Sequence, residues 1–88
     1  MKIYKYSVLE DSILEVPFKS ELLKVGTQEN KIVVWFMVSD EPVIDSYQFK
    51  IIMTGESFEI EDFEYIDTVF IGWLVCHVFA KQLDYKND

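Results

Sequence analysis

The side chains with the widest chemical repertoire are the only cysteine, Cys76, and the only histidine, His77, adjacent within the apolar stretch IGWLVCHVFA. A cysteine–histidine nucleophile needs a hydrogen bond between the two side chains. The stretch is rich in β-branched and aromatic residues and predicts a strand, in which neighbouring side chains point to opposite faces. We therefore expect no catalytic pair here, and expect Cys76 to be a packed core thiol.

His77 has two interpretations, which the sequence leaves open. Strand alternation places it on one face with Trp73, Val75 and Phe79. A histidine in such an apolar row is most often a core or interface residue with one ring nitrogen hydrogen-bonded. Alternatively, it is the polar group of an aromatic-lined pocket, in which the imidazole and the Trp73 indole contact a ligand base.

Acidic side chains are concentrated between Glu56 and Asp67. This segment lacks the DxDxDG spacing of a calcium-binding EF-hand loop, and its predicted exposure does not suit the buried acid of a glycosidase. One cysteine and one histidine cannot complete a structural zinc site within a single chain. We expect a solvated acidic face, with no metal, no cofactor and no catalytic residue.

Binding chemistry is better supported, by aromatic and lysine residues. Aromatic side chains make up 16% of the chain, more than one small core needs, so some are candidates for stacking on a planar ligand. Lys5, Lys24 and Lys50 lie on predicted strands and are candidates for phosphate contacts, and the backbone of MTGES, residues 53–57, for an anion-binding nest. The candidate ligand-binding residues are Tyr4, Lys5, Trp35, Lys50, Thr54, Gly55, Trp73 and His77.

The elements that must position these residues are short strands. Period-two alternation and turn residues at intervals of roughly 8–12 residues predict an all-β fold, a small antiparallel sandwich or barrel-like single domain of six or seven short strands. The domain covers residues 1–88, with 82–88 a frayed tail. The predicted strands are 2–9, 13–16, 21–28, 32–38, 47–54, 65–71 and 73–81.

Two strands carry additional information. Residues 32–38 are apolar on both faces, which is typical of a central strand or of one covered by a partner subunit. Gly26 interrupts the third strand and marks a bulge or a close approach. A chain of 88 residues that is 50% hydrophobic has a modest core and apolar surface to spare, so we expect a homo-oligomer.

The charge balance narrows the class of partner. Sixteen acidic residues stand against eight basic ones, all lysine, for a net charge of −8. Without a basic footprint or arginine, binding to a DNA or RNA duplex is not expected. A small anion can still be bound by backbone N–H groups and a few lysines. The single cysteine, the absence of a signal-peptide pattern and the absence of a run of about 18 apolar residues favour a cytoplasmic protein with no membrane span.

The order of short motifs resembles a family of small bacteriophage proteins of unknown function. Its members begin with a strand like M-K-I-Y-K-Y, carry V-Q-x-Q-N-G and L-W-A motifs, continue with F-x-I-x-G-T-G-H, and close with Y-I-G-T and L-V-x-H-V-F. The matching positions in this chain are Tyr4, Lys5, Tyr6, Gln28, Asn30, Trp35, Phe49, Ile51, Thr54, Gly55, Tyr65, Ile66, Thr68, Gly72, Leu74, Val75, His77, Val78 and Phe79.

The chain departs from that pattern, and three of the departures bear on function. Glu56 stands in place of the middle histidine, Asp67 replaces the glycine of Y-I-G-T, and Glu29 alters the turn. If the middle motif contacts a ligand, Glu56 puts that contact in doubt, particularly for an anion.

The resemblance implies a small β-rich phage protein of the infected host cytoplasm. It connects the chain with sponges that sequester cyclic oligonucleotide immune signals of the host, an anti-CBASS activity that needs a tight pocket and no catalyst. The ligand would be a cyclic di- or trinucleotide, held at a subunit interface. The alternative is an acidic protein inhibitor that masks a host defence or housekeeping protein, which the net charge favours.

Overall fold

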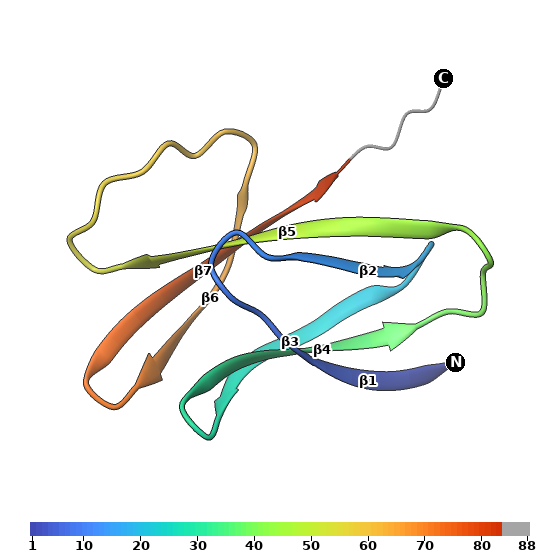
Figure 1. Ribbon diagram of the computed structural model, residues 1–88, viewed down its shortest axis with the longest axis horizontal. Coiled ribbons are helices and arrows are strands. Elements are labelled where there is room, and N and C mark those ends of the chain that lie inside the picture. The colour runs from blue at the N-terminus through green and yellow to red at the C-terminus, as the bar shows by residue number, and fades with distance from the viewer. Residues whose placement is uncertain (84–88) are drawn as a thin grey trace.

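The computed structural model describes residues 1–83 and consists of seven strands in two antiparallel sheets (Figure 1). One sheet has the order β1-β4-β3 and the other the order β2-β5-β7-β6. The predicted all-β fold is therefore confirmed. Within residues 1–83 no helix long and apolar enough to cross a membrane is present. The strands are β1 (Lys2–Ser7), β2 (Ile13–Pro17), β3 (Glu21–Gln28), β4 (Lys31–Val38), β5 (Ile44–Met53), β6 (Glu64–Ile71) and β7 (Leu74–Leu83).

The core lies between the two sheets and is built from alternate residues of each strand. Val34 and Phe36 of β4 face Phe49 of β5 and Val78 of β7, and all four are completely buried. The rings of Phe36 and Tyr47 lie 5.4 Å apart between centroids. Because side chains alternate along a strand, the residues between these positions point to the outer faces of the sheets.

The β4 strand is the central strand of its sheet, which is one of the two alternatives that its two apolar faces left open. It pairs with β1 on one side and β3 on the other. Its outer residue Val33 is also buried, at 3% exposed. Both Glu29 and Asn30, at the turn before β4, have positive φ, the geometry of a type I′ hairpin turn.

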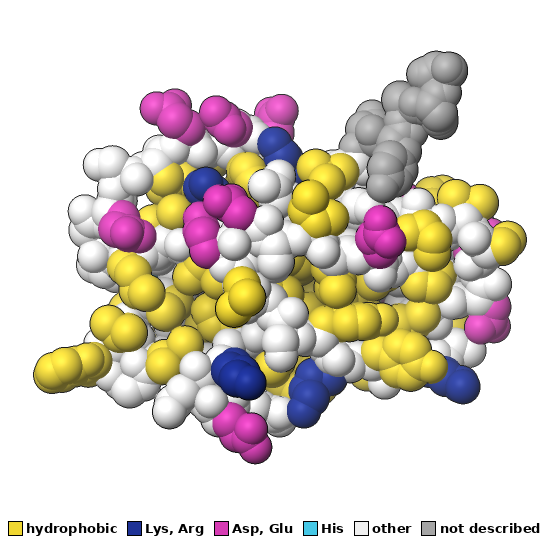
Figure 2. Space-filling view, viewed as in Figure 1, with side chains coloured by type: hydrophobic (Ala, Val, Ile, Leu, Met, Phe, Trp, Pro, Cys, Tyr) yellow, Lys and Arg dark blue, Asp and Glu magenta, His cyan; other side chains and the backbone are white. Residues whose placement is uncertain are grey.

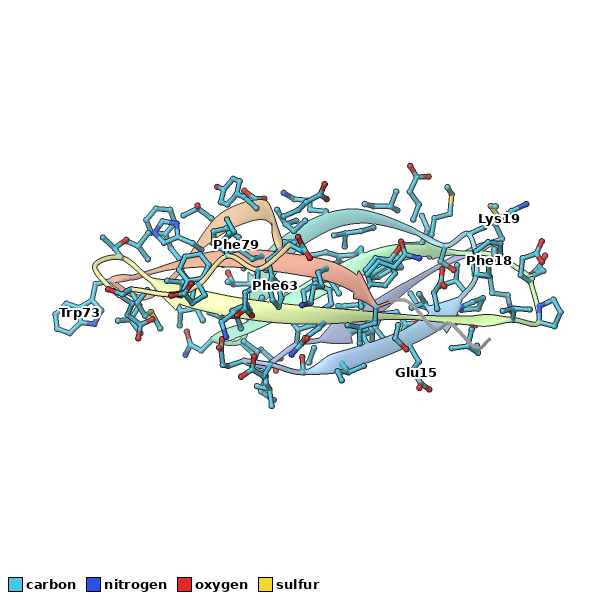
Figure 3. The ribbon with its side chains drawn as sticks, turned by 90° about the horizontal axis from the view of Figure 1, so that it is seen from above. Glu15, Phe18, Lys19, Phe63, Trp73 and Phe79 are labelled. Atoms are coloured by element: carbon cyan, nitrogen blue, oxygen red, sulfur yellow. The ribbon has the colours of Figure 1, made fainter. Side chains whose placement is uncertain are left out.

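Trp73 does not lie on the seventh strand, and this expectation was wrong. Gly72 has a φ of 60°, and only Gly72 and Trp73 separate the paired residues Ile71 and Leu74. This is the two-residue hairpin with glycine first that type II′ turns favour. The Trp73 side chain is 90% exposed and projects from one end of the sandwich, far from Phe79 (Figure 3).

Other strand boundaries differ from the sequence prediction by one to three residues, and two of them, in β5 and β7, have a clear cause. The β5 strand begins at Ile44 rather than at residue 47, because Ile44 pairs with Pro17 of β2 and the Phe18 amide donates to the Val43 carbonyl. The β7 strand continues through Leu83, which pairs with Ser46, so 82 and 83 are not part of a frayed tail. Residues 84–88 lie outside the described residues.

Truncating a core ring should be costly, whereas truncating the exposed indole should not. Phe36→Ala should lower the free energy of unfolding by about 3–5 kcal/mol, because it removes buried apolar surface and leaves a cavity. Trp73→Ala should change it by less than about 0.5 kcal/mol. Urea unfolding followed by circular dichroism measures both. Equal losses for the two variants would contradict the described core.

Alkaline pH should destabilise the fold. Burial raises the pKa of the Cys76 thiol. Burial raises the pKa of Tyr6, and the charge of Tyr4 adds to this effect. Burial also raises the pKa of Tyr47, and the charge of Asp45 adds to it. The folded chain therefore retains protons that the unfolded chain releases, so this stability is complete below the ordinary thiol value of 9.0 and is lost as pH rises through the raised values.

The measurement is the urea midpoint as a function of pH, with Cys76→Ala as the comparison. The wild-type midpoint should begin to fall above the ordinary thiol pKa of 9.0. In the variant, the fall should begin only near 10.0, the ordinary value of the two tyrosines. A midpoint that rises over this range would contradict the assignment.

Candidate functional site

The predicted ligand-binding residues lie on opposite sides of the sandwich. Lys5 and Trp35 pair with each other across β1 and β4, and they lie on the outer face of the three-stranded sheet because Trp35 alternates with the buried Val34 and Phe36. Thr54, Gly55 and His77 lie together at the outer face of the four-stranded sheet, where they line one cleft. A single chain therefore has two candidate sites rather than one.

The first site is the Trp35 face, defined by Trp35, Lys5, Lys24, Gly26 and Val33. The indole lies against the backbone of Gly26: a Cβ atom added there would be 3.2 Å from Cζ3 of Trp35. Val33 lies opposite Gly26 on this face, and its burial agrees with its being covered by the indole. Of the two roles predicted for Gly26, close approach is therefore confirmed; the bulge of β3 lies between Leu22 and Lys24.

Two lysines flank this indole. In the strand register, Lys5 lies opposite Trp35 on one side and Lys24 lies opposite it on the other. The Lys5 ammonium donates to the neutral amide oxygen of Gln28 at 2.6 Å. Within residues 1–83, the ion pairs involve the N-terminus and Lys50 only, so the charges of Lys5 and Lys24 are uncompensated at contact distance.

Acidic and basic side chains are concentrated on different parts of the surface. On the side shown in Figure 2, acidic side chains gather over the 54–63 loop and the adjoining part of β5. The edge over β1, β3 and β4 is rich in lysines instead. Although the net charge of the chain is −8, the β1-β4-β3 sheet is therefore locally basic.

The second site is the His77 cleft, of about 270 Å³. Both ring nitrogens of His77 contact threonine hydroxyls: Nε2 lies 2.8 Å from Oγ1 of Thr54, and Nδ1 lies 3.0 Å from Oγ1 of Thr68. The Thr68 hydroxyl is in turn 2.6 Å from that of Tyr65. The cleft is lined by Ile52, Met53, Thr54, Gly55, Glu56, Phe58, Tyr65, His77 and Phe79.

The partial burial and hydroxyl network of His77 exclude a histidine packed in the core, and do not distinguish an interface residue from a pocket residue. A neutral imidazole donates through one nitrogen and accepts through the other, and a threonine hydroxyl can do either. His77 is thus only partly buried, on the outer face, with both nitrogens engaged. It is not a core histidine, and Cys76 is buried on the opposite face, as alternation predicted.

Three predicted site residues lie outside both candidate sites. Tyr4 has the inward alternation of β1 and packs edge-on against Tyr6. Trp73 is at the hairpin tip. The Lys50 ammonium lies 3.6 Å from Glu10 and 3.5 Å from Asp11; partial burial acts to lower its pKa, but these two charges outweigh that effect and raise it.

Sequence reasoning missed two aromatic residues that line the His77 cleft, Phe58 and Tyr65, and the Thr68 hydroxyl that contacts His77. Phe58 comes from the irregular 54–63 loop, and its ring lies 4.8 Å from that of Phe79, a contact that no local pattern reveals. Tyr65 and Thr68 were not chosen as binding residues, although both are positions of the family pattern. Within residues 1–83, no three side chains of the His, Cys, Asp or Glu types converge to hold a metal ion.

Comparison with known proteins gives one match. A family profile described as a domain of unknown function, DUF7352, matches residues 1–87. Since the match covers nearly the whole chain, the protein belongs to this family. No curated protein and no solved structure matches the chain significantly.

Removing the Thr68 hydroxyl should destabilise the fold and alter His77. Thr68→Val keeps the side-chain shape but removes the partner of both His77 Nδ1 and the Tyr65 hydroxyl, so the free energy of unfolding should fall by about 1–2 kcal/mol. The imidazole ¹⁵N shifts should show a changed tautomer ratio. Thr27→Val, at an exposed strand position, should do neither; unchanged ¹⁵N shifts in Thr68→Val would contradict the network.

Proposed function

We propose that this DUF7352 protein binds a cyclic di- or trinucleotide and holds it without cleaving it, on the Trp35 face. One observation carries the proposal: a partly exposed indole, fixed against Gly26, lies between two lysines that have no carboxylate partner within residues 1–83. Stacking on an aromatic ring suits any nucleobase, and flanking ammonium groups suit the phosphates that join the bases.

The fixed position of the indole favours binding. Because Trp35 already rests on the sheet, little side-chain freedom remains to be lost when a base stacks on its outer side. The ammonium of Lys5 is likewise held by Gln28. The net charge of −8 opposes long-range attraction of an anion, so the affinity must come from these local contacts and association should be slow relative to a basic protein.

A cyclic ligand presents at least two bases, whereas one chain has one Trp35 face. Two copies with these faces opposed would stack on both bases and surround the phosphates with four lysines, two from each copy. The apolar pair Ile3 and Met37, with Ile3 61% exposed, lies two residues from the Lys5–Trp35 pair in the register and would supply the contact between copies. We therefore propose a homo-oligomer that acts in the host cytoplasm.

An acidic surface supports the second candidate, a protein inhibitor. Glu10, Glu56, Glu59 and Glu61 line a shallow hollow of about 610 Å³ around Lys50. Carboxylates in such a group could imitate the phosphates of a nucleic acid and occupy the basic site of a host protein. This function would not use Trp35.

The test is calorimetric titration with a panel of cyclic di- and trinucleotides, followed by mass analysis of the recovered ligand. Trp35→Leu should weaken binding by about 10-fold or more, because stacking contributes about 1–3 kcal/mol per base. Lys24→Gln should weaken it several-fold and reduce its salt dependence. Lys19→Gln is the matched control and should have no effect. Lys19 lies over the Phe18 ring, at the end of the sandwich opposite Trp73 (Figure 3).

Three results would argue against the proposal. Altered ligand after recovery would indicate an enzyme. Equal weakening by Lys19→Gln would indicate non-specific attraction. Failure of every cyclic nucleotide to bind would favour the second candidate, the protein inhibitor. In that case Glu59→Gln should weaken the complex of this protein with its host target, and Trp35→Leu should not.

A further inference from the structure

We propose that the His77 cleft is a separate binding site for a small organic cation, a quaternary ammonium or fully methylated amine. The cleft lies on the opposite side of the sandwich from the Trp35 face and contains no lysine. Its volume of about 270 Å³ is just below the usual range of ligand pockets, about 300–1,000 Å³. The expected ligand is therefore a compact head group rather than a nucleotide.

Aromatic rings form one side of this cleft. Phe79 is flanked by Phe58, with centroids 4.8 Å apart and planes at 60°, and by Tyr65, at 5.6 Å and 71°. Rings inclined in this way present both faces and edges to the cleft. The face of an aromatic ring carries the negative end of its quadrupole and attracts a cation, which is how methylated ammonium groups are recognised.

A carboxylate at the rim supplies the complementary charge. The Oε1 atom of Glu56 accepts a hydrogen bond from the Met53 amide at 2.8 Å, which fixes the side chain beside the cleft. Within residues 1–83, no ammonium group pairs with Glu56; Lys50 is paired with Glu10 and Asp11. An anion placed here would face this fixed negative charge, whereas a cation would be attracted by it.

The polar side of the cleft favours a cation without N–H groups. The hydroxyls of Thr54 and Thr68 are already used by the two ring nitrogens of His77, so the wall is rigid and most of its polar capacity is satisfied. A primary ammonium would need acceptors for three N–H donors. A quaternary ammonium needs none, and its methyl groups can pack against Ile52 and Phe79.

The test compares two ligands of the same shape, choline and its neutral isostere 3,3-dimethylbutan-1-ol, by NMR titration of the full chain. Choline should shift resonances of Phe58, Phe79 and Thr54 in a saturable manner, and the neutral isostere should bind at least 10-fold more weakly. This comparison needs no variant and so does not depend on the folding of one. Equal binding of the two, or no saturable shift with choline, would overturn the proposal.

Variants then locate the site. Glu56→Gln should weaken choline binding several-fold, and Phe58→Leu, which keeps an apolar side chain but removes the ring, should weaken it by a similar factor. Glu59→Gln removes the same charge from a residue outside the cleft and should leave the affinity within twofold; an effect equal to that of Glu56→Gln would show diffuse attraction only and overturn the site. Trp35→Leu should leave choline binding intact, so this proposal and the one for the Trp35 face can fail independently.

Discussion

The rings of Phe36 and Tyr47 meet across the space between two sheets that share no strand ladder, and the rest of the structure depends on such inward packing. Backbone hydrogen bonds hold each sheet together, but it is buried side chains that hold one sheet against the other. The inward positions are therefore committed to the core. Any binding chemistry must come from the outward positions, the edges and the turns.

This constraint explains why the chain has two unlike surfaces. On the outer face of the three-stranded sheet, Trp35 lies between Lys5 and Lys24, and within residues 1–83 neither lysine forms an ion pair. On the outer face of the four-stranded sheet, the 54–63 loop adds Phe58 and Glu56 to a row that contains His77 and Phe79. Opposite local charges on opposite faces favour ligands of opposite sign.

Much of the fold could be predicted from the sequence because its signals are local. Alternation placed Cys76 and His77 on opposite faces, and the two apolar faces of 32–38 favoured a central strand or one covered by a partner subunit. The position of Trp73 was predicted wrongly because a tryptophan in an apolar run suits a strand equally well, and only the hairpin register shows that Gly72 and Trp73 form the turn. The start of β5 depends on its pairing with β2, which is a tertiary effect.

The candidate sites were less predictable, because each joins residues that are distant in sequence. His77 was identified, but its partners Thr68 and Thr54 become meaningful only when β5, β6 and β7 are adjacent. Lys50 was a reasonable phosphate contact until the strand order brought it beside Glu10 and Asp11. Ion pairing of this kind leaves no trace in composition or spacing.

The contact between Gly26 and Trp35 has a consequence for how this chain can diverge. A side chain at residue 26 would meet the indole at 3.2 Å, so residue 26 can enlarge only if residue 35 shrinks or its ring is displaced. The two positions lie on neighbouring strands, so a larger side chain at residue 26 should favour a smaller side chain at residue 35. Among members of the family, a glycine at the first position should accompany a large aromatic residue at the second, and such covariation would reveal which members retain the flat surface.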